Sequence, residues 1–292
     1  MGAQPDRERP SGRKRRPCDF TRLLPPGGSA TAAQIVAGLG LRELGAGAHE
    51  RPYVMLNMVS SVDGRASVGG RSGPLGGGAD RELFHELRGG VDAVMAGAGT
   101  VRTERYGRII AQEERRRRRR EQGLSEEPLA CIVSGRLSLS PDIPLLADPA
   151  SHVVMLTSSQ ASLPRTPAHV EYVRAERDGR LDLPAALSEL RARFAVRVLL
   201  CEGGPHLNGQ LLAASLVDEL FLSLSPRLAG GDPALGDPAL RILAGPEFEP
   251  PVELGLKDGL ASDSHLFLRY GVRACASERV SRETMSKSSL AS

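Results

Sequence analysis

Apolar and polar positions along the chain predict a domain in which strands alternate with helices. Short apolar runs without helical spacing, typical of strands buried on both faces, begin at Tyr53 and recur along the chain. Segments with apolar residues on one helical face lie between or after them. The predicted strands cover residues 53–59, 91–96, 129–133, 152–156, 170–173 and 197–201, and the predicted helices cover residues 80–88, 183–194 and 207–214. This alternation predicts an α/β fold with a mostly parallel central sheet.

The pattern changes after Asp218. Apolar runs at residues 220–224, 251–256 and 264–270 follow one another without a helical segment of similar strength between them. The sequence Lys-Asp-Gly at residues 257–259 has the composition of a tight turn. We therefore expect the sheet to end in antiparallel strands, with a C-terminal hairpin that turns at residues 257–259.

The same patterns divide the chain into four parts. Residues 1–30 are rich in Arg, Pro and Gly and predict a flexible basic tail. Residues 31–51 predict a short helical lead-in, with Thr31 as the cap of a helix that runs to about Leu44. Residues 52–273 form the main domain, interrupted by a charged insertion at residues 111–127, and the Ser-rich residues 274–292 predict a frayed tail.

Composition and charge exclude several classes of protein. The formal net charge of the 292-residue chain is only +3, and much of the positive charge lies in two runs, at residues 13–16 and 115–120. The second run is flanked by glutamates and has no interleaved aromatic residues, so it predicts a solvated helix or loop. We expect no nucleic-acid partner, although a nucleic-acid-binding protein that uses this run is the alternative from another functional class.

Cysteine usage and hydropathy indicate the compartment. The four cysteines form no CxxC pair, and no His, Cys and carboxylate cluster has metal-ligand spacing, so we predict neither a disulfide framework nor a metal. No apolar run has the length of a signal peptide's core or approaches the roughly 20 residues of a membrane span. We therefore expect a cytoplasmic protein without a membrane partner.

The first segment that indicates chemistry ends the predicted strand at residues 91–96. The sequence Gly97-Ala98-Gly99-Thr100 offers a tight turn and backbone amides to a phosphate, as a dinucleotide requires. Arg102 replaces the third glycine of the Rossmann fingerprint, so a simple strand-to-helix turn remains an alternative. The next strand ends in Ser-Gly-Arg at residues 134–136, where an NAD site carries an acid, and a hydroxyl with a guanidinium suits the 2′-phosphate of NADPH.

A second turn runs from the strand at residues 197–201 through Gly203 and Gly204 into a helix. Glu202 lies at the carboxyl end of this strand, where ligands of open α/β sheets bind. Glu202 as a surface or helix-capping carboxylate is the alternative interpretation. A third, glycine-rich segment at residues 60–78 suggests a loop that folds over a site, although Asp63-Gly64 is equally consistent with a plain turn.

These segments together resemble a known family. Residues 57–64, 87–102, 202–205 and 216–220 are similar to the pyrimidine reductase domain of the riboflavin pathway, which is often the C-terminal half of a bifunctional deaminase-reductase. The resemblance spans residues 52–273 and implies a dihydrofolate-reductase-like three-layer fold, NADPH as hydride donor, a small-molecule substrate and a homodimer. The sequence has no His-x-Glu with Pro-Cys-x-x-Cys, so zinc deamination is excluded.

The resemblance and the glycine turns together give candidate site residues. The cofactor-binding candidates are Val59, Pro74, Gly97, Gly99, Thr100, Glu104, Ser134, Gly203, Gly204, Pro205, His206, Leu207 and Asn208. The substrate-binding candidates are Ser72, Arg88, Arg108 and Glu202. Glu104 stands where the family usually has aspartate. The family usually continues with Asp-Pro-x-Leu and an arginine that holds substrate phosphate, and Arg108 is the candidate replacement for that arginine.

The implied reaction resembles that of 5-amino-6-(5-phosphoribosylamino)uracil reductase. The ribosylamine opens to an imine, and hydride added at the sugar carbon gives a ribitylamine. Asp63 and Glu202 are the candidates for orienting or protonating the substrate, unless ring opening precedes binding and requires no enzymic acid. The alternatives are a dihydrofolate or pterin reductase on the same fold and a non-catalytic homologue that binds NADPH.

Overall fold

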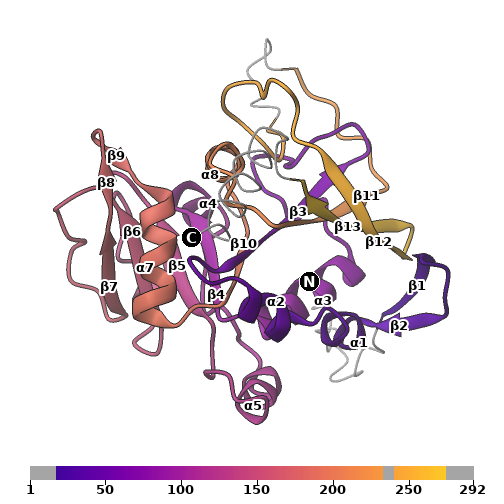
Figure 1. Cartoon of the computed structure of the whole chain (residues 1–292), viewed down its shortest axis with the longest axis horizontal. Helices are drawn as coiled ribbons and strands as arrows, with labels where there is room; N and C mark the ends of the chain where they lie inside the picture. Colours follow the sequence, from indigo (N-terminus) through magenta and orange to yellow (C-terminus); the bar gives the residue numbers. More distant parts are fainter. Residues whose placement is uncertain (1–17, 233–239, 274–292) are drawn as a thin grey trace, which may run out of the picture.

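The computed structural model describes residues 18–232 and 240–273, which form an 11-stranded sheet with helices on both faces (Figure 1). The sheet's strands are β1 (Asp19–Leu24), β2 (Ser29–Thr31), β3 (Tyr53–Ser61), β4 (Ala93–Gly97), β5 (Leu129–Val133), β6 (His152–Thr157), β7 (His169–Arg174), β10 (Val198–Cys201), β11 (Glu219–Ser225), β12 (Leu254–Ser262) and β13 (His265–Val272). A separate two-stranded ribbon is formed by β8 (Glu176–Arg177) and β9 (Arg180–Leu181). The helices are α1 (Ala32–Ala37), α2 (Leu41–Gly47), α3 (Gly78–Gly90), α4 (Ala98–Thr103), α5 (Glu113–Glu121), α6 (Pro144–Ala147), α7 (Leu183–Phe194) and α8 (Pro205–Ala213).

The strand order is β2-β1-β12-β13-β11-β3-β10-β4-β5-β6-β7. Every pairing from β11 to β7 is parallel, and every pairing from β2 to β11 is antiparallel. The predicted α/β fold with a mostly parallel sheet and an antiparallel C-terminal hairpin is confirmed. Because the central strands are parallel, their carboxyl ends meet at one edge of the sheet, where ligands of such folds bind.

Alternating side chains on the central strands build two cores. On β3, Met55 packs in a cluster that includes apolar residues of α1, α2 and α3. Its neighbours Val54 and Leu56 point the other way and pack in a second cluster with residues of α7 and α8. These strands are apolar at successive positions because both faces are covered, and the result is a three-layer arrangement.

The N-terminal region differs from the sequence prediction. Residues 19–24, expected in a flexible tail, form β1, which extends the sheet by antiparallel pairing with β12. Phe20 is fully buried, with its ring 5.1 Å from that of Phe267. The predicted boundary at residue 30 is therefore wrong, because Phe20 finds an apolar partner that local composition does not reveal. Residues 1–17 and 274–292 of the two expected tails lie outside the described residues.

The lead-in is two helices rather than one. Thr31 caps α1 as predicted, accepting a hydrogen bond from the backbone of Gln34. The chain then leaves the helical conformation, and Gly40, with φ of 64°, begins α2. Glycine adopts this left-handed conformation without the steric cost that a Cβ atom imposes.

The C-terminal hairpin turns later than predicted. Residues 257–259 lie inside β12, at a shift in the pairing with β13, and the turn is made by Asp263 and Ser264, whose φ values are 47° and 61°. Side-chain contacts favour this register, since Lys257 donates to Glu219 at 2.6 Å and Arg269 donates to Asp258 at 3.1 Å. The Asp-Gly pair therefore marks an irregularity within the strand and not the hairpin loop.

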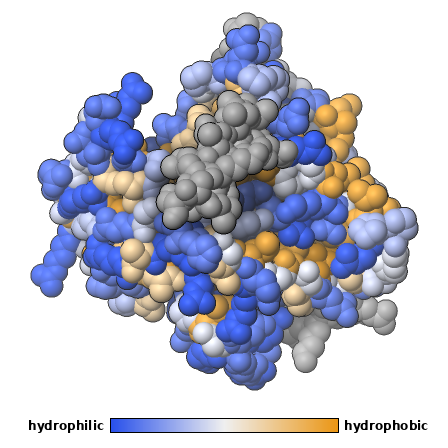
Figure 2. All heavy atoms as spheres, in the orientation of Figure 1, coloured by the Kyte–Doolittle hydropathy of each residue, from blue (hydrophilic) through white to orange (hydrophobic). Residues whose placement is uncertain are grey.

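The charged insertion contains α5, which packs against α3. Figure 2 shows a hydrophilic surface at the lower end of the view, where Figure 1 places α5. Arg119, however, is only 1% exposed, so the prediction of a solvated segment is wrong for this residue. Within the described residues, no helix combines the length and the apolar character needed to cross a bilayer.

The buried ring on β1 gives a test of the fold. We expect Phe20→Ala to lower the free energy of unfolding by about 3–5 kcal/mol, because it removes a fully buried aromatic side chain. Leu23→Ala on the same strand is the control, since Leu23 is 48% exposed and its loss should cost less than about 0.5 kcal/mol. Urea unfolding followed by circular dichroism measures both, and equal small losses would contradict the assignment of β1 to the core.

Candidate active site

A cleft of about 770 Å³ opens at the carboxyl ends of β3, β10 and β4. Four segments contribute most of its lining: residues 57–59, residues 97–107 without Ala98 and Val101, residues 202–207, and parts of the glycine-rich loop and α3 between residues 66 and 88. Residues 240–244 close a further side. Of the sequence candidates, the cleft is lined by Val59, Ser72, Arg88, Gly97, Gly99, Thr100, Glu104, Glu202, Gly203, Gly204, Pro205, His206 and Leu207.

The two glycine turns converge in this cleft. Strands β10 and β4 are parallel neighbours, with Cys201 opposite Met95. Just beyond them, the Gly97 amide donates to the Gly203 carbonyl at 2.7 Å, and the Glu202 amide donates to the Met95 carbonyl at 2.8 Å. Two adjacent strand ends therefore present their turns side by side, as binding of a single pyrophosphate requires.

Close packing explains the glycines of these turns. Gly203 has φ of 89°, a conformation that favours glycine, and its peptide bond to Gly204 is cis. A Cβ atom at Gly204 would lie 2.9 Å from Oγ1 of Thr100. At Gly99, by contrast, a Cβ atom would meet nothing within 4 Å, so the backbone there faces open space. A ligand can approach the Gly99 backbone directly.

A buried ion pair forms one wall of the cleft. Glu202 follows β10, and its carboxylate accepts from Nε and Nη2 of Arg88 on α3, both at 2.7 Å. The hydroxyl of Tyr106 donates to the same carboxylate at 2.5 Å. The Arg88 guanidinium also lies 4.2 Å from the ring centroid of Phe84 and 5.4 Å from that of Tyr106. These contacts fix Arg88 and Glu202 in one orientation.

Electrostatics fix the protonation states of this cluster. Burial alone would lower the pKa of Arg88, but the adjacent Glu202 carboxylate raises it above its ordinary value. Burial, followed by the Glu202 charge, raises the pKa of Tyr106 well above its ordinary value. Arg88 is therefore a permanent cation, and Tyr106 keeps its proton and donates it to Glu202 in a hydrogen bond.

Ser72 and Glu104 fasten the glycine-rich loop to the cleft. The Glu104 carboxylate accepts from the backbone amide of Ser72 at 2.8 Å and from its hydroxyl at 3.0 Å. Glu104 caps the C-terminal end of α4, the helix that follows Gly97. The contact therefore joins the loop that follows β3 to the turn that follows β4.

Asp63 lies outside the cleft lining and has structural partners. Its carboxylate accepts from the Ser61 hydroxyl at 2.5 Å and from the Gly230 amide at 2.7 Å, and it also accepts from the Ala229 amide. The Ser61 hydrogen bond, with the two backbone amides, lowers the pKa of Asp63 to about 2. A carboxylate that is ionised near neutral pH cannot supply a proton, so this geometry does not support Asp63 as a catalytic acid.

Four other candidates also lie outside the lining. The Arg108 guanidinium forms an ion pair with Glu127 of the charged insertion, and its Nε lies 4.0 Å from Oδ2 of Asp148. Asn208 is fully buried and donates to the Ile242 carbonyl at 2.8 Å, which ties the segment at residues 240–244 to α8. The remaining two are Pro74, which is exposed, and Ser134, which is buried at the end of β5.

The sequence analysis missed several residues that line the cleft. Arg81, Phe84 and Arg88 recur at spacings of three and four on one face of α3, a periodicity that could have revealed the first two. Arg81 and Arg105 are exposed, and neither forms an ion pair within the part of the chain that the structure describes. Asp80 lines the cleft at the start of α3, and burial raises the pKa of its carboxyl.

Comparisons with known proteins agree with this geometry. Residues 52–244 match the family model of the RibD C-terminal domain. The 2,5-diamino-6-ribosylamino-4(3H)-pyrimidinone 5′-phosphate reductase of Archaeoglobus fulgidus is 31% identical over 183 residues, which cover 62% of this chain and 83% of that protein. The enzyme of the same name from Methanothermobacter thermautotrophicus is 29% identical over 187 residues, covering 62% and 81%.

Solved structures share the fold. A pyrimidine reductase-like protein from Corynebacterium diphtheriae superimposes with a TM-score of 0.67 at 24% identity, covering 84% of this chain and 100% of that one. The riboflavin biosynthesis reductase Rib7 of Saccharomyces cerevisia gives a TM-score of 0.58 at 19% identity, covering 79% and 95%. The fold expected from the sequence resemblance is therefore confirmed.

The low pKa of Asp63 predicts a pH-dependent contribution to stability. Its folded pKa of about 2 lies below the ordinary 3.8, so the carboxylate stabilises the fold above the ordinary pKa, and this stabilisation is lost as the pH falls through about 2. Asp63→Asn should therefore be less stable than the wild type at about pH 6, with the difference shrinking toward about pH 2. Chemical unfolding at both pH values measures this difference. Lost turnover at unchanged stability would instead assign Asp63 to catalysis.

Proposed function

The chain belongs to the family of the RibD C-terminal domain, and we propose that it reduces a phosphorylated ribosylaminopyrimidine to the ribitylamino form with NADPH as hydride donor. The observation that carries this proposal is the convergence of two glycine turns and a buried Arg88–Glu202 pair in one cleft. The relatives from Archaeoglobus fulgidus and Methanothermobacter thermautotrophicus, named as reductases of such a phosphate, supply the substrate class.

The residues present fit a dinucleotide. The open space at Gly99 and the close approach of the turns at Gly97 and Gly203 leave backbone accessible to a pyrophosphate. Strand β5 lies beside β4 on the side away from β10, so residues 134–136 flank the turn that follows β4. Ser134 is buried, but Arg136 is exposed beside this turn, and a guanidinium there suits the 2′-phosphate, which favours NADPH over NADH.

The buried pair is suited to hold the pyrimidine. Glu202 is held by Arg88 and Tyr106 and still lines the cleft, so its carboxylate can accept hydrogen bonds from N–H groups of the base. Arg88 uses three of its five N–H groups in the contacts with Glu202 and the Ile109 carbonyl, which leaves donors for a substrate oxygen. Ser72, fixed by Glu104, lies on the adjacent loop.

Two arginines other than the predicted Arg108 are suited to bind the substrate phosphate. Arg108 is committed to Glu127, whereas Arg81 and Arg105 line the cleft and are exposed. Guanidinium groups form charge-assisted, often bidentate hydrogen bonds with phosphate. We therefore assign the phosphate to Arg81 and Arg105 in place of Arg108.

The chemistry requires positioning more than acid–base catalysis by the protein. NADPH, when bound, supplies the hydride. The walls formed by the glycine turns and by the Arg88–Glu202 pair are suited to align the reacting carbon with the cofactor site. Asp63 is ionised and Tyr106 holds its proton tightly, so neither is suited to protonate the imine nitrogen. Asp80 is the cleft carboxyl whose pKa burial raises, which makes it the side chain best suited to carry that proton.

The alternatives make different predictions. A pterin or dihydrofolate reductase would use the same glycine turns with another substrate, and a non-catalytic homologue would bind NADPH without turnover. No contact among the residues that the structure describes favours either over pyrimidine reduction. The nucleic-acid alternative has less support, because five of the six arginines of residues 115–120 form ion pairs within the chain and the sixth, Arg119, is buried, but it stays an alternative. The homodimer and the cytoplasmic location stay predictions.

The function is tested by oxidation of NADPH, followed at its absorbance, with each candidate substrate in turn. We expect turnover with 2,5-diamino-6-ribosylamino-4(3H)-pyrimidinone 5′-phosphate or with 5-amino-6-(5-phosphoribosylamino)uracil, and the ratio of the two rates identifies the preferred base. NADH and dihydrofolate serve as controls. Turnover of dihydrofolate alone, or NADPH binding without any turnover, would overturn the proposal.

Gly99 provides a substitution that separates cofactor binding from folding. A valine side chain at Gly99 meets no protein atom at its Cβ and projects into open space of the cleft, so we expect Gly99→Val to raise the KM for NADPH by about tenfold or more with little change in stability. Gly47→Val is the control, because Gly47 also has open space around its Cβ position but lies on α2, outside the cleft lining. An unchanged KM in Gly99→Val would place the dinucleotide elsewhere.

A further inference from the structure

The buried arginine of the charged insertion caps the helix that carries Arg88. Nη1 of Arg119 donates to the carbonyls of Val91, Gly89 and Arg88 at 2.7, 3.0 and 3.3 Å, and its Nε donates to the Ser125 carbonyl at 2.8 Å. These α3 carbonyls lie at the C-terminal end of the helix, where intrahelical partners are absent and a cation is favoured. Burial lowers the pKa of Arg119 to about 10, so it remains charged near neutral pH.

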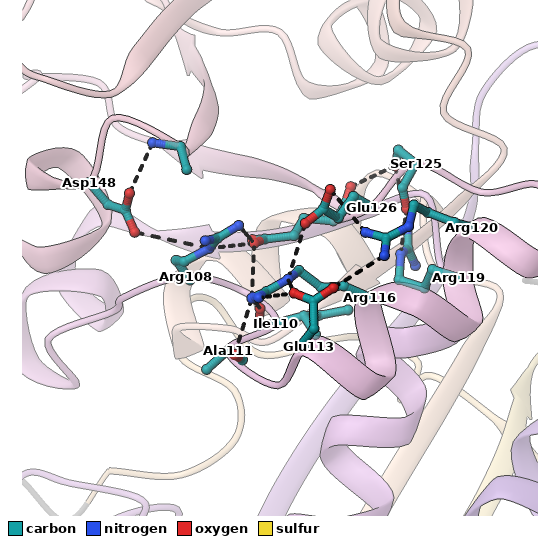
Figure 3. Close-up of polar contacts among 12 residues, drawn as sticks. Arg108, Ile110, Ala111, Glu113, Arg116, Arg119, Arg120, Ser125, Glu126 and Asp148 are labelled. Atoms are coloured by element: carbon teal, nitrogen blue, oxygen red, sulfur yellow. Dashed lines mark hydrogen bonds and ion pairs between the residues drawn. The ribbon is translucent and has the colours of Figure 1, made fainter.

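The other arginines of α5 hold the insertion in place. Arg115 and Arg118 both bind Glu86 of α3, at 3.0 and 2.9 Å. Figure 3 shows a second network, in which Arg116 and Arg120 each form ion pairs with Glu113 and Glu126. The first set of contacts fixes α5 to α3, and the second ties α5 to the segment that follows it. Both sets act on a helix with no apolar side chain of its own.

Arg88 is therefore held from two sides by one segment. Its backbone carbonyl accepts from Arg119, and its side chain donates through Nη1 to the Ile109 carbonyl at 3.1 Å, two residues before the insertion begins. We propose that residues 109–127 act as a clamp that positions the Arg88 guanidinium for the substrate, with Arg119 as its positioning residue. The clamp rests on the proposed function only in that Arg88 is taken to contact substrate.

The test compares two arginines on one helix. Arg119→Met removes the donors while keeping an unbranched apolar side chain. Arg117→Met is the control, because Arg117 is 58% exposed and its ion pairs among the described residues are with Glu114 and Glu121 of the same helix. We expect Arg119→Met to raise the KM for the pyrimidine substrate by about tenfold and to leave the KM for NADPH within about twofold. Arg119→Lys should raise the KM for the pyrimidine substrate less than Arg119→Met does. Arg117→Met should change neither KM.

A second variant covers the case in which Arg119→Met fails to fold. Glu86→Gln releases Arg115 and Arg118 from α3 but leaves Arg119 in place, and we expect a smaller change of the same kind. The clamp would be overturned if Arg119→Met raised the KM values for NADPH and for the pyrimidine equally. It would also be overturned if a folded Arg119→Met kept the wild-type KM for the pyrimidine.

A readout without substrate separates the clamp from the proposed function. The Nε–H of Arg88, which donates to Glu202, gives a nitrogen-15 NMR signal that Arg88→Lys identifies by its loss. We expect this signal to shift or broaden in Arg119→Met and to be unchanged in Arg117→Met. If the wild type reduces no pyrimidine while this pattern holds, the proposed function fails and the clamp stands. An Arg88 signal identical in all folded variants contradicts the clamp.

A second, independent feature lies at the far edge of the sheet. His152 on β6 lies opposite His169 on the edge strand β7, and Glu171 follows on the same face two residues later. Candidate ligand atoms of these three side chains lie within 4.8 Å of one another, and Nε2 of His152 is 2.7 Å from Oε2 of Glu171. Arg193 binds the other carboxylate oxygen at 2.9 Å and so orients the carboxylate.

The geometry points to a surface site for a borderline divalent metal such as Zn²⁺. Two imidazoles and one carboxylate are a donor set that suits zinc, with water completing the coordination, and the two paired strands hold the donors in register. The sequence predicted no metal, because His152 and His169 are 17 positions apart and this is not a metal-ligand spacing. Only the strand pairing brings them together.

Isothermal titration of the tag-free chain with ZnCl₂ tests this site. We expect one saturable site that is lost in His152→Ala and in His169→Ala and retained in His49→Ala, an exposed histidine outside the cluster. MgCl₂ should give no binding, since Mg²⁺ prefers oxygen ligands. Unchanged zinc binding in the double variant of His152 and His169, or no saturable binding in the wild type, would overturn the site.

Discussion

The buried ion pair between Arg88 and Glu202 is the interaction on which the cleft depends. Removing two charges from water is costly, and the cost is offset only when the pairing is close and the remaining hydrogen-bonding groups are satisfied. Here the contact is bidentate, and Tyr106 donates a third hydrogen bond to the carboxylate, while two of the five N–H groups of Arg88 remain for a ligand. Because Glu202 directly follows a central strand and Arg88 lies in the last turn of α3, the pair joins sheet and helix across the cleft.

Much of the fold could be predicted from the sequence, because its signals are local. Apolar runs buried on both faces and glycines at strand ends are visible in short windows, and they located the central strands and both turns of the cleft. Strand β1 could not be found in this way. Its membership of the sheet depends on a contact between Phe20 and Phe267, which lie at opposite ends of the chain. The hairpin was misplaced because Asp258-Gly259 has turn composition but lies at an irregularity inside a strand.

The site residues also divide into those that local sequence patterns reveal and those whose role depends on the fold. Arg88 and Glu202 could be predicted because they lie beside recognisable motifs, whereas the role of Tyr106 depends on the fold of the segment after α4. The arginine run is more instructive, since Arg117 and Arg119 have the same local composition and opposite environments. Which of them is buried depends on how α5 is rotated against α3, and sequence spacing alone does not determine that rotation.

The charged insertion contacts two arginines that the sequence placed in the substrate site, Arg108 and Arg88. At one end it binds Arg108 through Glu127, so an arginine expected at the substrate phosphate is withdrawn from the cleft. At the other end Arg119 of the insertion donates to the carbonyl of Arg88, and the Ile109 carbonyl, two residues before the insertion, accepts from the Arg88 guanidinium. Under the proposed function, the substrate phosphate therefore falls to other arginines, and Arg81 and Arg105 are exposed along the same cleft.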